Sequence, residues 1–583
     1  MQNHATTPLG WELLDEKRAV VASGKTTVFG KDAASGDNVH LIDFSAFTKP
    51  GSSYKLRVGS DESDPFDIAT NLYDKLKYQS LAYFYHNRSG IEITMPFAGD
   101  KQWARAAGHV ADKSDKGVPC MPDSGCSYTL DVTGGWYDAG DHGKYVVNGG
   151  ISVWTLLDQY ERAKQFGGAA DFGDGKLNIP ESHNGIPDLL DEARWEIEFL
   201  LKMQVPEGQT LAGMVHHKVH DKEWTALGLA PSDDKIARFL HAPSTAATLN
   251  VAAVAAQAAR VFKPFDTGFA AKCLTAAERA WKAAEAHPAV YALASDASGG
   301  GPYDDKNVTD ELYWAAAELF ITTGKPEYQE FVTKSPHFKS VPTSLPDGNA
   351  SSFAWGNTEA LGTISLALVP NKLPAADIAG ARKSIQAAAD SYVEIIQGQG
   401  YRLPFKPGAK NDYPWGSNSF ILNNAMVLAL ASDFSHDPKY LNGVAESMDY
   451  ILGRNPLDQS YVTGYGERPL ENPHHRFWAN QVDKRFPKAP PGIVSGGPNS
   501  GLQDPYVQAA GLAGCAPERC FVDNIEAWSA NEITINWNAP LAWVAAYLDE
   551  KAKATPAEAH GKGKAHEGKE KEPAKAHEPK KKP

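Results

Sequence analysis

Two patterns of hydrophobic and polar positions divide the chain near residue 70. Before that point, short β-branched or alternating runs are separated by Gly, Asp, Ser and Lys, which is typical of β-strands joined by turns. The runs occupy residues 19–22, 26–29, 39–44 and 54–58. We therefore expect a small all-β sandwich over residues 1–69, which is short for a complete one.

After residue 70 the apolar residues recur at helical spacing, with loops between the stretches. Eleven stretches are clear: 72–84, 153–164, 186–203, 244–261, 274–286, 309–323, 358–368, 375–396, 419–431, 438–452 and 532–548. Many are rich in Ala and apolar around most of their circumference, so we expect them to be buried or packed on two sides. Strand signals between them are sparse. The pattern predicts one mainly α domain over residues 70–550, a toroid of helical hairpins whose loops form a groove at one end.

The last stretch, residues 551–583, is a tract of Lys, Glu, His, Pro, Ala and Gly without apolar periodicity. Such a composition cannot bury a core, so we expect a disordered tail. The tract holds 10 Lys and 5 Glu, so it is locally basic. A solvated tail explains it, and a tail that adheres to polysaccharide is the alternative.

The composition excludes two classes of partner. Of the 583 residues, 42% are hydrophobic, which is enough for a sizeable core. No run of about 18 apolar residues occurs, so we expect no transmembrane helix and no membrane partner. The net charge of −14 argues against nucleic acid as a partner. Aromatic residues are plentiful, as is common in enzymes that act on carbohydrates, with 14 Trp, 22 Tyr and 23 Phe.

The five cysteines and the first residues bear on the cellular compartment. Cys120 with Cys126 and Cys515 with Cys520 form two close pairs, and Cys273 is left over. Close pairs in loops indicate disulfides in an oxidising compartment or metal ligands in a reducing one. The N-terminus lacks a basic segment followed by an apolar one. We expect a secreted or periplasmic protein whose signal peptide is absent from this chain, and a cytoplasmic location is the alternative.

The densest chemical stretch is 134–145, where Asp138 and Asp141 stand among four glycines and three aromatic residues that include Trp136. Two neighbouring carboxyl groups cannot both ionise freely, so they share a proton or a water. Aromatic faces suit the apolar faces of a sugar ring. The stretch is therefore a candidate general-base site, and an acidic surface turn is the alternative.

Two later stretches add possible partners. Residues 460–476 form a loop rich in Gly and Pro that carries Tyr461, His474 and Arg476, and such cations hold a sugar hydroxyl or orient a carboxylate. The alternative there is a salt-bridged structural loop. Residues 521–532 place acids beside Trp528. A carboxyl group that is partly shielded from water has a raised pKa and can act as a general acid. The alternative is helix capping by Asn531 and Glu532.

Together the three stretches resemble glycoside hydrolase family 9, the inverting cellulases. The histidine signature of that family is matched by Ser460, Val462, Thr463, Gly466, Arg468, Pro473, His474 and Arg476. Its acid signature is matched by Phe521, Asp523, Trp528, Glu532, Thr534, Asn538 and Ala539, and its Asp-Ala-Gly-Asp element by residues 138–141. The resemblance covers about residues 70–549 and implies an (α/α)6 barrel. The strands before it look like the immunoglobulin-like module of many bacterial members, here without its first strands.

The resemblance also implies roles for the residues of these stretches. Asp141 would be the general base, Asp138 its partner in holding the water, and Glu532 the general acid. His474 and Arg476 would bind the sugar near the cleavage point. An inverting enzyme needs its two carboxyl groups roughly 6.5–9.5 Å apart, so the fold must bring together residues from opposite ends of the chain.

Further substrate-binding candidates surround these residues. Tyr461 lies in the same signature loop as His474, and Asp523 would support the acid. The candidates for stacking on sugars are Trp136, Trp314, Trp355 and Trp415. Core packing explains Trp314 at least as well, because it sits in a helical stretch.

Metals are implied more weakly. Many relatives bind calcium through an Asp-Glu pair near the start of a barrel helix, and Asp310 with Glu311 fits that pair, with Asp304 and Asp305 as nearby oxygen donors. An acid pair at a helix N-terminus is the alternative. Some relatives hold zinc on two Cys and two His. Here Tyr137 stands where such a His is often found, so we favour a Cys120–Cys126 disulfide over zinc, with His109 as a conceivable extra ligand.

We therefore expect an endo-1,4-β-glucanase that acts on cellulose, soluble β-glucans or cello-oligosaccharides and needs no cofactor for its chemistry. An exo-acting cellodextrinase, β-glucosidase or glucosaminidase on the same scaffold is the alternative. A non-catalytic glycan-binding protein is a further one, against which the three carboxyl groups argue. We expect a monomer.

Overall fold

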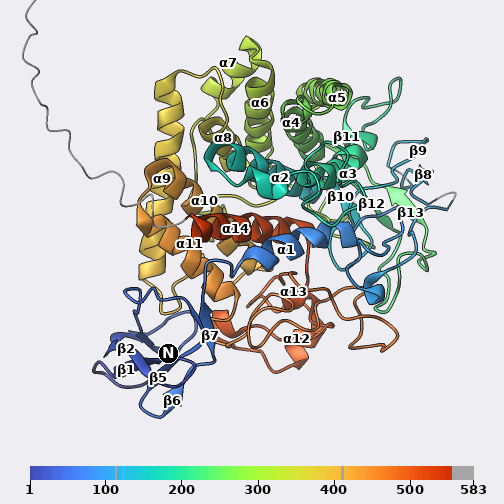
Figure 1. The fold of residues 1–583 in the computed structure, drawn as a ribbon. Helices are drawn as coiled ribbons and strands as arrows, with labels where there is room; N and C mark the ends of the chain where they lie inside the picture. The colour runs from blue at the N-terminus through green and yellow to red at the C-terminus, as the bar shows by residue number, and fades with distance from the viewer. Residues whose placement is uncertain (112–113, 123, 409–411, 555–583) are drawn as a thin grey trace, which may run out of the picture.

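The computed structural model of the chain describes residues 1–111, 114–122, 124–408 and 412–554. A small β module at the N-terminus lies beside a large helical domain (Figure 1). Most of the tail predicted over residues 551–583 falls outside the described residues. Its first three residues belong to the last helix, α14 (Ile535–Lys553).

The N-terminal module is built from antiparallel strands. One sheet has the order β2 (Val20–Lys25), β1 (Gly10–Leu14), β5 (Gly51–Val58) and β6 (Asp61–Glu62), with β7 (Phe66–Ile68) also paired to β5. A separate hairpin joins β3 (Thr27–Lys31) to β4 (Asn38–Leu41). The module has its own small core, formed by Trp11, Leu13, Tyr54 and Val58. The four predicted runs overlap β2, β3, β4 and β5, but the prediction missed the short strands β1, β6 and β7, none of which exceeds five residues.

By their contacts, the helices of the domain form a ring of six inner helices packed against six outer helices. The inner helices are α2 (Val146–Phe166), α4 (Thr245–Phe262), α6 (Thr309–Thr323), α8 (Glu359–Leu368), α10 (Ser417–Ser435) and α14. The outer helices are α1 (Asp74–His86), α3 (Asp188–Lys202), α5 (Thr267–Ala286), α7 (Pro326–Lys334), α9 (Ala375–Gln397) and α11 (Pro438–Ile451). The inner helices from α2 to α8 contact one another in turn, α9 bridges α8 and α10, and α14 closes the ring against α2. The predicted (α/α)6 barrel is confirmed.

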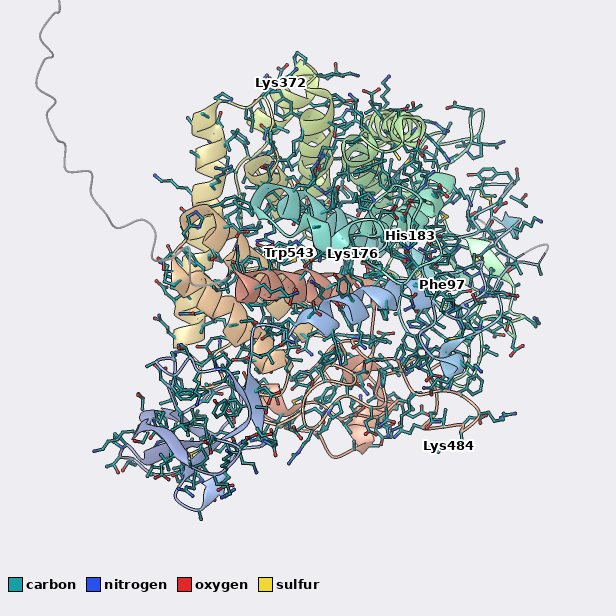
Figure 2. All side chains as sticks on the ribbon, in the orientation of Figure 1. Phe97, Lys176, His183, Lys372, Lys484 and Trp543 are labelled. Carbon is teal, nitrogen blue, oxygen red and sulfur yellow. A yellow bond between two sulfur atoms is a disulfide. The ribbon has the colours of Figure 1, made fainter. Side chains whose placement is uncertain are left out.

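Burial explains why the inner helices are apolar around their circumference. In α4 every residue but Arg260 is buried, whereas the outer helix α9 exposes a polar face to solvent. Trp543 of α14 lies inside the ring, while Lys372 and Lys484 lie at the edge of the molecule (Figure 2). The sequence prediction missed α7, which is short and mostly polar. None of the helices in the described part of the chain is long and apolar enough to cross a membrane.

The loops between the helices carry the remaining short elements. The strands are β8 (Val118–Pro119), β9 (Thr129–Leu130), β10 (Lys144–Tyr145), β11 (Val215–His216), β12 (Lys218–Asp221), β13 (Arg238–Leu240) and β14 (Pro243–Ser244). The short helices are α12 (Pro505–Ala509) and α13 (Trp528–Asn531), with 3₁₀ turns at Lys101–Trp103, Ala169–Phe172 and Pro517–Arg519. Strands β10 and β14 lead directly into the inner helices α2 and α4, and α13 precedes α14. The segments before the inner helices therefore gather at one end of the ring.

Two aspartates are among the residues through which the β module docks on the helical domain. Asp37 pairs with Arg519 at 2.7 Å and accepts a hydrogen bond from the hydroxyl of Tyr401 at 2.8 Å. Asp32 accepts a hydrogen bond from the backbone N–H of Gly400 at 2.8 Å. Arg519 lies between Cys515 and Cys520, in the segment that leads to α13 and α14. The module therefore contacts the part of the barrel that carries the candidate acid.

Candidate active site

The loop with the two aspartates is folded tightly against the start of α2. The backbone N–H of Asp138 donates to the carbonyl of Gly143, which closes a turn around Asp141. A side chain at Gly140 would place its Cβ 2.4 Å from the carbonyl oxygen of His474. Only glycine therefore lets the histidine loop approach this closely. The backbone N–H of Arg476 in that loop donates back to the carbonyl of Gly140 at 2.9 Å.

Asp138 is completely enclosed by hydrogen-bond donors. The amide of Asn148 reaches both of its carboxylate oxygens, at 2.9 and 3.0 Å, and the hydroxyl of Tyr303 donates to Oδ2 at 3.0 Å. Thr534 at the start of α14 donates to Oδ1 at 3.4 Å. Burial, together with the negative charge of Asp141, raises the pKa of Asp138 to about 7. Asp138 thus joins α2, α14 and the Tyr303 loop, and it titrates near neutrality.

Asp141 is anchored through only one oxygen. Its Oδ2 accepts hydrogen bonds from the backbone N–H of Gly143 and from the hydroxyl of Tyr145, both at 3.1 Å. Its Oδ1 accepts no hydrogen bond within the described residues. A carboxylate held at one oxygen and free at the other has the form required of a base that orients a water molecule.

The prediction of a helix over 532–548 placed Glu532 in the last helix. In the structure Glu532 lies outside that helix. It is in extended backbone between α13 and α14, where Thr534 is the N-cap residue of α14. It forms a parallel β-bridge with His474, and its side chain is half-buried. The helix-capping alternative is therefore wrong for this residue. Burial, reinforced by the charges of Asp141 and Asp138, raises the pKa of Glu532 well above its ordinary value.

His474 and Arg476 lie beside this pair of loops. The Nδ1–H of His474 donates to the carbonyl of Ile525 at 2.5 Å, so its Nε2 can accept from the guanidinium of Arg476 at 2.8 Å. Arg476 also donates through Nε to the hydroxyl of Thr225 at 3.1 Å. Burial and the charge of Arg476 lower the pKa of His474 to about 3, so the imidazole is neutral. The pair presents one fixed positive charge, carried by Arg476, near Gly140.

Asp523 joins the histidine loop to the acid segment. Its carboxylate accepts hydrogen bonds from the backbone N–H groups of Glu471 at 2.8 Å and Asn472 at 2.9 Å, and from the side chain of Asn531 at 3.1 Å. Since Asn531 directly precedes Glu532, Asp523 fixes the acid segment against the loop that carries His474. This position beside the acid segment is the one expected from the sequence.

Three of the predicted substrate-binding aromatics are buried and cannot contact a sugar. Tyr461 has no exposed surface and packs edge-on against Phe521 at a centroid distance of 5.0 Å. Trp136 is equally buried, and its indole N–H donates to Glu192 at 2.9 Å. Trp314 is enclosed in α6. The sequence could not show the direction of these side chains, which is set by packing between helices.

The other two aromatic candidates lie near the carboxyl groups. Trp355 is partly exposed and contacts the ring of Tyr303 edge-on at 5.1 Å, and Tyr303 holds Asp138. Trp415 is 38% exposed and lies against Trp528, with their ring centroids 5.1 Å apart. Both remain candidates for stacking on sugar rings.

Sequence reasoning missed several residues of the site. Tyr303, Tyr145 and Asn148 donate to the two aspartates, and Trp224 is 53% exposed next to Thr225, the partner of Arg476. The three glycines shortly before Tyr303 are a sequence signal for a close approach of the backbone. In the structure, Gly300 has no room for a side chain because it lies against Tyr145. No local signal marks Asn148, whose role depends on the turn of α2 that faces the loop.

The predicted calcium residues form a second buried group of carboxyl groups. Asp310 accepts a hydrogen bond from the backbone N–H of Thr358 at 2.8 Å through one oxygen. Its other oxygen, both oxygens of Glu311 and one oxygen of Asp305 are buried without a hydrogen-bond partner among the described residues. Burial, with the charges of Asp310 and Asp305, raises the pKa of Glu311 well above its ordinary value. Carboxylate oxygens are the type of donor that calcium takes, so the chemistry of these side chains suits that ion.

The cysteines do not fit a zinc site. Cys120 is bonded to Cys126 and Cys515 to Cys520, so none of these sulfurs is free to bind a metal. The ring of His109 turns away from them toward Tyr137, whose hydroxyl lies 2.6 Å from His109 Nδ1. Cys273 is buried in α5, and burial raises the pKa of its thiol to about 12.

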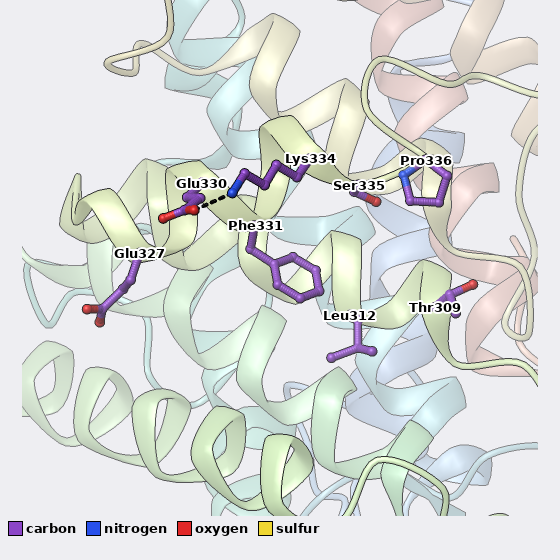
Figure 3. A pocket seen from close by; sticks show the side chains of 8 residues that line it. All are labelled: Thr309, Leu312, Glu327, Glu330, Phe331, Lys334, Ser335 and Pro336. Atoms are coloured by element: carbon purple, nitrogen blue, oxygen red, sulfur yellow. Dashed lines mark hydrogen bonds and ion pairs between the residues drawn. The ribbon is translucent and has the colours of Figure 1, made fainter.

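A hollow of about 460 Å³ lies between the start of α6 and the helix α7 (Figure 3). It is lined by Thr309, Leu312, Glu327, Glu330, Phe331, Lys334, Ser335 and Pro336. Glu330 and Lys334 form an ion pair one helical turn apart across its rim. It contains none of the candidate catalytic residues.

Two family models match the chain. The one described as "Glycosyl hydrolase family 9" matches residues 73–545, and "Cellulase N-terminal ig-like domain" matches residues 1–63. The "Cellulose 1,4-beta-cellobiosidase" of Acetivibrio thermocellus is 53% identical over 95% of this chain and 65% of that protein. "Endoglucanase C" of Cellulomonas fimi is 48% identical over 95% of this chain and 50% of that protein. The chain thus spans only about half to two thirds of the length of these relatives.

Solved structures give the same result. A metagenome-derived glycoside hydrolase family 9 endoglucanase superimposes with a TM-score of 0.80 at 33% identity, over 94% of this chain and 93% of that one. The family 9 endoglucanase J30 superimposes with a TM-score of 0.82 at 31% identity, over 93% and 96% of the two chains. By its family match, its relatives and its barrel with a preceding immunoglobulin-like module, the chain belongs to glycosyl hydrolase family 9.

Proposed function

We propose that the protein hydrolyses β-1,4-glucosidic bonds in cellulose, soluble β-glucans or cello-oligosaccharides, as an inverting endo-1,4-β-glucanase. The observation that carries this proposal is the meeting of two unlike carboxyl groups at one end of the barrel. Glu532 has a strongly raised pKa, and Asp141 has one anchored oxygen and one free oxygen. The names of the relatives, an endoglucanase and a cellobiosidase, support the substrate class.

The chemistry follows from this difference between the carboxyl groups. Burial and the negative charges of Asp141 and Asp138 raise the pKa of Glu532 and so favour its protonated form, which can donate a proton to the leaving oxygen. Asp141 takes a proton from a water molecule that attacks the anomeric carbon from the opposite face. Both carboxyl groups then exchange their protons with solvent.

Asp138 and the two basic side chains position the reactants. Both oxygens of Asp138 already accept hydrogen bonds from protein donors, so it assists Asp141 by fixing the loop and by its charge. Arg476 offers the guanidinium hydrogens that its bonds to His474 and Thr225 leave free, which suit sugar hydroxyl groups. Trp355 and Trp415 supply partly exposed aromatic faces for stacking.

The proposal is tested with Glu532→Gln and Glu526→Gln. The first keeps the shape of the side chain but cannot donate a proton, and the second changes an exposed acid in the same segment. We expect kcat of E532Q on carboxymethyl-cellulose to fall about 10²–10⁴-fold, the usual contribution of a general acid, and E526Q to match the wild type. Wild-type activity in E532Q would contradict the assignment. Inversion is checked by NMR of the first product, which must have the α configuration at its new reducing end.

Exo-action on the same scaffold remains the second candidate, because one relative is named as a cellobiosidase. Products from reduced, labelled cellohexaose over time separate the two. Endo-action gives several product lengths from the start, whereas exo-action releases one short product from one end. Single-product release would replace the endo proposal while leaving the roles of Asp141 and Glu532 unchanged.

We propose further that Asp305, Asp310 and Glu311 hold a structural calcium ion. The four buried carboxylate oxygens without a partner support this, because they need either protons or a cation. The ion would join two loops. One contains Thr358, which is hydrogen-bonded to Asp310, and the other contains Tyr303, which is close to Asp305 in the chain. The ion would supply no chemistry to the reaction and would only hold these loops in place.

We also propose that the protein acts outside the reducing cytosol as a monomer. Two bonded cysteine pairs suit an oxidising compartment. The described helices of this one chain close the ring and bury the apolar faces of the inner helices. The ring therefore needs no helix from a second chain. Light scattering at micromolar concentration would contradict the monomer if it gave twice the mass of the chain.

A further inference from the structure

A buried lysine is paired with the residue that holds the candidate base. Lys218 is the first residue of β12, and its side chain has no exposed surface. In the ladder between β10 and β12 it stands directly opposite Tyr145, which leads into α2. Residues paired across neighbouring strands have their side chains on the same face of the sheet. The lysine therefore lies on the same face as the tyrosine whose hydroxyl donates to Asp141.

The ammonium group of Lys218 holds the loop of residues 296–303. Its Nζ donates to the carbonyl of Asp296 at 2.5 Å and to the carbonyl of Gly301 at 2.8 Å. The carboxylate of Asp296 lies 3.5 Å from the same nitrogen. One buried side chain thus fixes two points of a loop that also carries Tyr303, the donor to Asp138.

Gly301 connects this lysine to the candidate base. Its carbonyl accepts from Lys218, and its backbone N–H donates to the hydroxyl oxygen of Tyr145 at 3.1 Å. A hydroxyl group has one hydrogen to donate, and that of Tyr145 goes to Oδ2 of Asp141 at 3.1 Å. Three successive hydrogen bonds therefore lead from the buried ammonium group to the anchored oxygen of the base.

The backbone of the loop approaches β12 as closely as glycine allows. A Cβ on Gly300 would lie 2.4 Å from the ring of His220 and 2.5 Å from the hydroxyl of Tyr145. A Cβ on Gly299 would lie 2.1 Å from the carbonyl oxygen of Asp221, and the φ of this glycine is +80°. Side chains at these two positions would push the loop away from the strand. The hydrogen bonds of Gly301 therefore depend on this close packing.

The surroundings of Lys218 keep it charged. Burial lowers its pKa to about 8, and the negative charges of Asp296 and Asp141 oppose that change. The lysine is therefore mainly protonated at neutral pH. The other titratable groups that face it are three imidazoles, which are neutral because burial lowers their pKa: His217, His220 and His241.

The groups on the other sides of Asp141 carry negative charge or none. Burial, together with the charge of Asp141, raises the pKa of Asp138 and of Glu532. The other two buried cations of the sheet, Lys144 and Arg238, are both paired with Asp115. The tyrosines that face Asp141 are uncharged because burial raises their pKa: Tyr83, Tyr145 and Tyr303. Lys218 therefore supplies positive charge on the side of the base that Tyr145 contacts.

We propose that Lys218 is a positioning residue for the general base Asp141 and acts on it through Gly301 and Tyr145. This inference rests on the proposed function, because it takes Asp141 to be the base. The ammonium group fixes the loop whose N–H orients the hydroxyl of Tyr145. Its positive charge also favours the carboxylate form of Asp141. Since it is fully buried, Lys218 does not contact the substrate.

The test compares Lys218→Met with the wild type on carboxymethyl-cellulose over a range of pH. Methionine has a similar volume but neither a charge nor N–H donors. We expect kcat to fall about tenfold with KM unchanged, because a poorly oriented base slows the chemical step without weakening binding. The acidic limb of the pH–rate profile should move to higher pH by at least about 0.5 unit, because a carboxylate without a nearby positive charge takes up a proton more readily. Lys222→Met, at the exposed lysine that follows β12, is the matched control and should keep the wild-type profile.

Tyr145→Phe interrupts the same chain of hydrogen bonds while leaving the lysine in place. We expect its kcat also to fall about tenfold, the effect of losing one hydrogen bond to a charged group. Because both changes break one chain, the double variant should lose less than the product of the two single effects. This second variant tests the proposal even if circular dichroism shows that K218M does not fold.

Several outcomes would overturn the inference. One is a wild-type kcat in Y145F, and another is an unmoved acidic limb in folded K218M, which would make the lysine a purely structural residue. A double variant whose loss equals the product of the single losses would show that Lys218 does not act through Tyr145. Asp141→Asn separates these results from a failure of the proposed function. If D141N kept wild-type activity, the function itself would be wrong, whereas an inactive D141N beside a normal K218M would remove only the role of Lys218.

Discussion

The barrel contains two groups of three carboxyl groups, and they differ in how their oxygens are satisfied. In the first, Asp138 accepts four hydrogen bonds, Asp141 accepts two at one oxygen, and Glu532 is half-buried. In the second, formed by Asp305, Asp310 and Glu311, four buried oxygens lack a partner among the described residues.

The difference separates two uses of the same residue types. Donors around Asp138 and Asp141 offset part of the cost of burying their negative charge. In the second group, backbone N–H groups donate to one oxygen of Asp310 and one of Asp305, and the four other oxygens need protons or a cation. Burial raises the pKa of both Glu532 and Glu311, but only Glu532 is open to a substrate.

Replacing the base should give the largest effect on activity. Asp141→Asn keeps the hydrogen bonds at Oδ2 possible but cannot accept a proton, so we expect kcat to fall about 10²–10⁴-fold. Asp233→Asn is a control for loss of one negative charge and should keep full activity. A wild-type kcat in D141N would contradict the assignment of Asp141 as the general base.

The same variant sharpens the assignment of the acid. The charge of Asp141 is one of the causes that raise the pKa of Glu532, so its removal should lower that pKa. Activity requires protonated Glu532 and is lost as pH rises through its pKa. We therefore expect the alkaline limb of the pH–rate profile to move to lower pH in D141N, measured with azide as an external nucleophile. An unmoved limb would mean that another group sets it.

Removing calcium should affect stability more than chemistry. With calcium at about 100 times its dissociation constant, binding adds about 2.7 kcal/mol, so chelation should lower Tm by about 3 °C in a domain of this size. Glu311→Gln should abolish the response of Tm to calcium, whereas Glu327→Gln, an exposed acid on α7, should keep it. Equal calcium responses in the two variants would contradict the site.

The sign of the pH dependence gives a further check on this group. Without calcium, the pKa of Glu311 is raised in the folded state, so the protein binds more protons when folded. That contribution to stability is full below the ordinary glutamate pKa and is lost as pH rises toward the folded value. With calcium, deprotonated carboxylates are required, so stability should rise over the same range. Tm measured from pH 5 to 8 with and without chelator tests the reversal.

The smallest expected effect comes from Tyr303→Phe. It removes one of the donors of Asp138 but leaves Asn148 and Thr534 in place. One hydrogen bond to a charged group is worth about 1.5 kcal/mol, so we expect kcat to fall roughly tenfold. Tyr291→Phe, at an exposed tyrosine of the same segment, is the control. An effect as large as that of D141N would mean that Asp138 takes part directly in proton transfer.

Local periodicity was enough to predict a toroid of helical hairpins, and the resemblance to family 9 implied the (α/α)6 barrel. All eleven predicted helical stretches overlap helices of the barrel, because each buries an apolar face that repeats along the sequence. The helix that was missed, α7, is short and carries mostly polar residues. In the β module, four strands were predicted, and β1, β6 and β7 were missed because strands of two to five residues give a weak alternating signal.

The sequence by itself determined the chemical types of the site, through three dense stretches with Asp138, Asp141, His474, Arg476 and Glu532. Only the tertiary structure decided which aromatic residues are buried, since Tyr461 and Trp136 turn into the core. It also decided that Tyr303, which is 165 residues away, holds Asp138. The physical reason is that residue type and spacing are local, whereas burial and hydrogen-bond partners depend on contacts between distant segments.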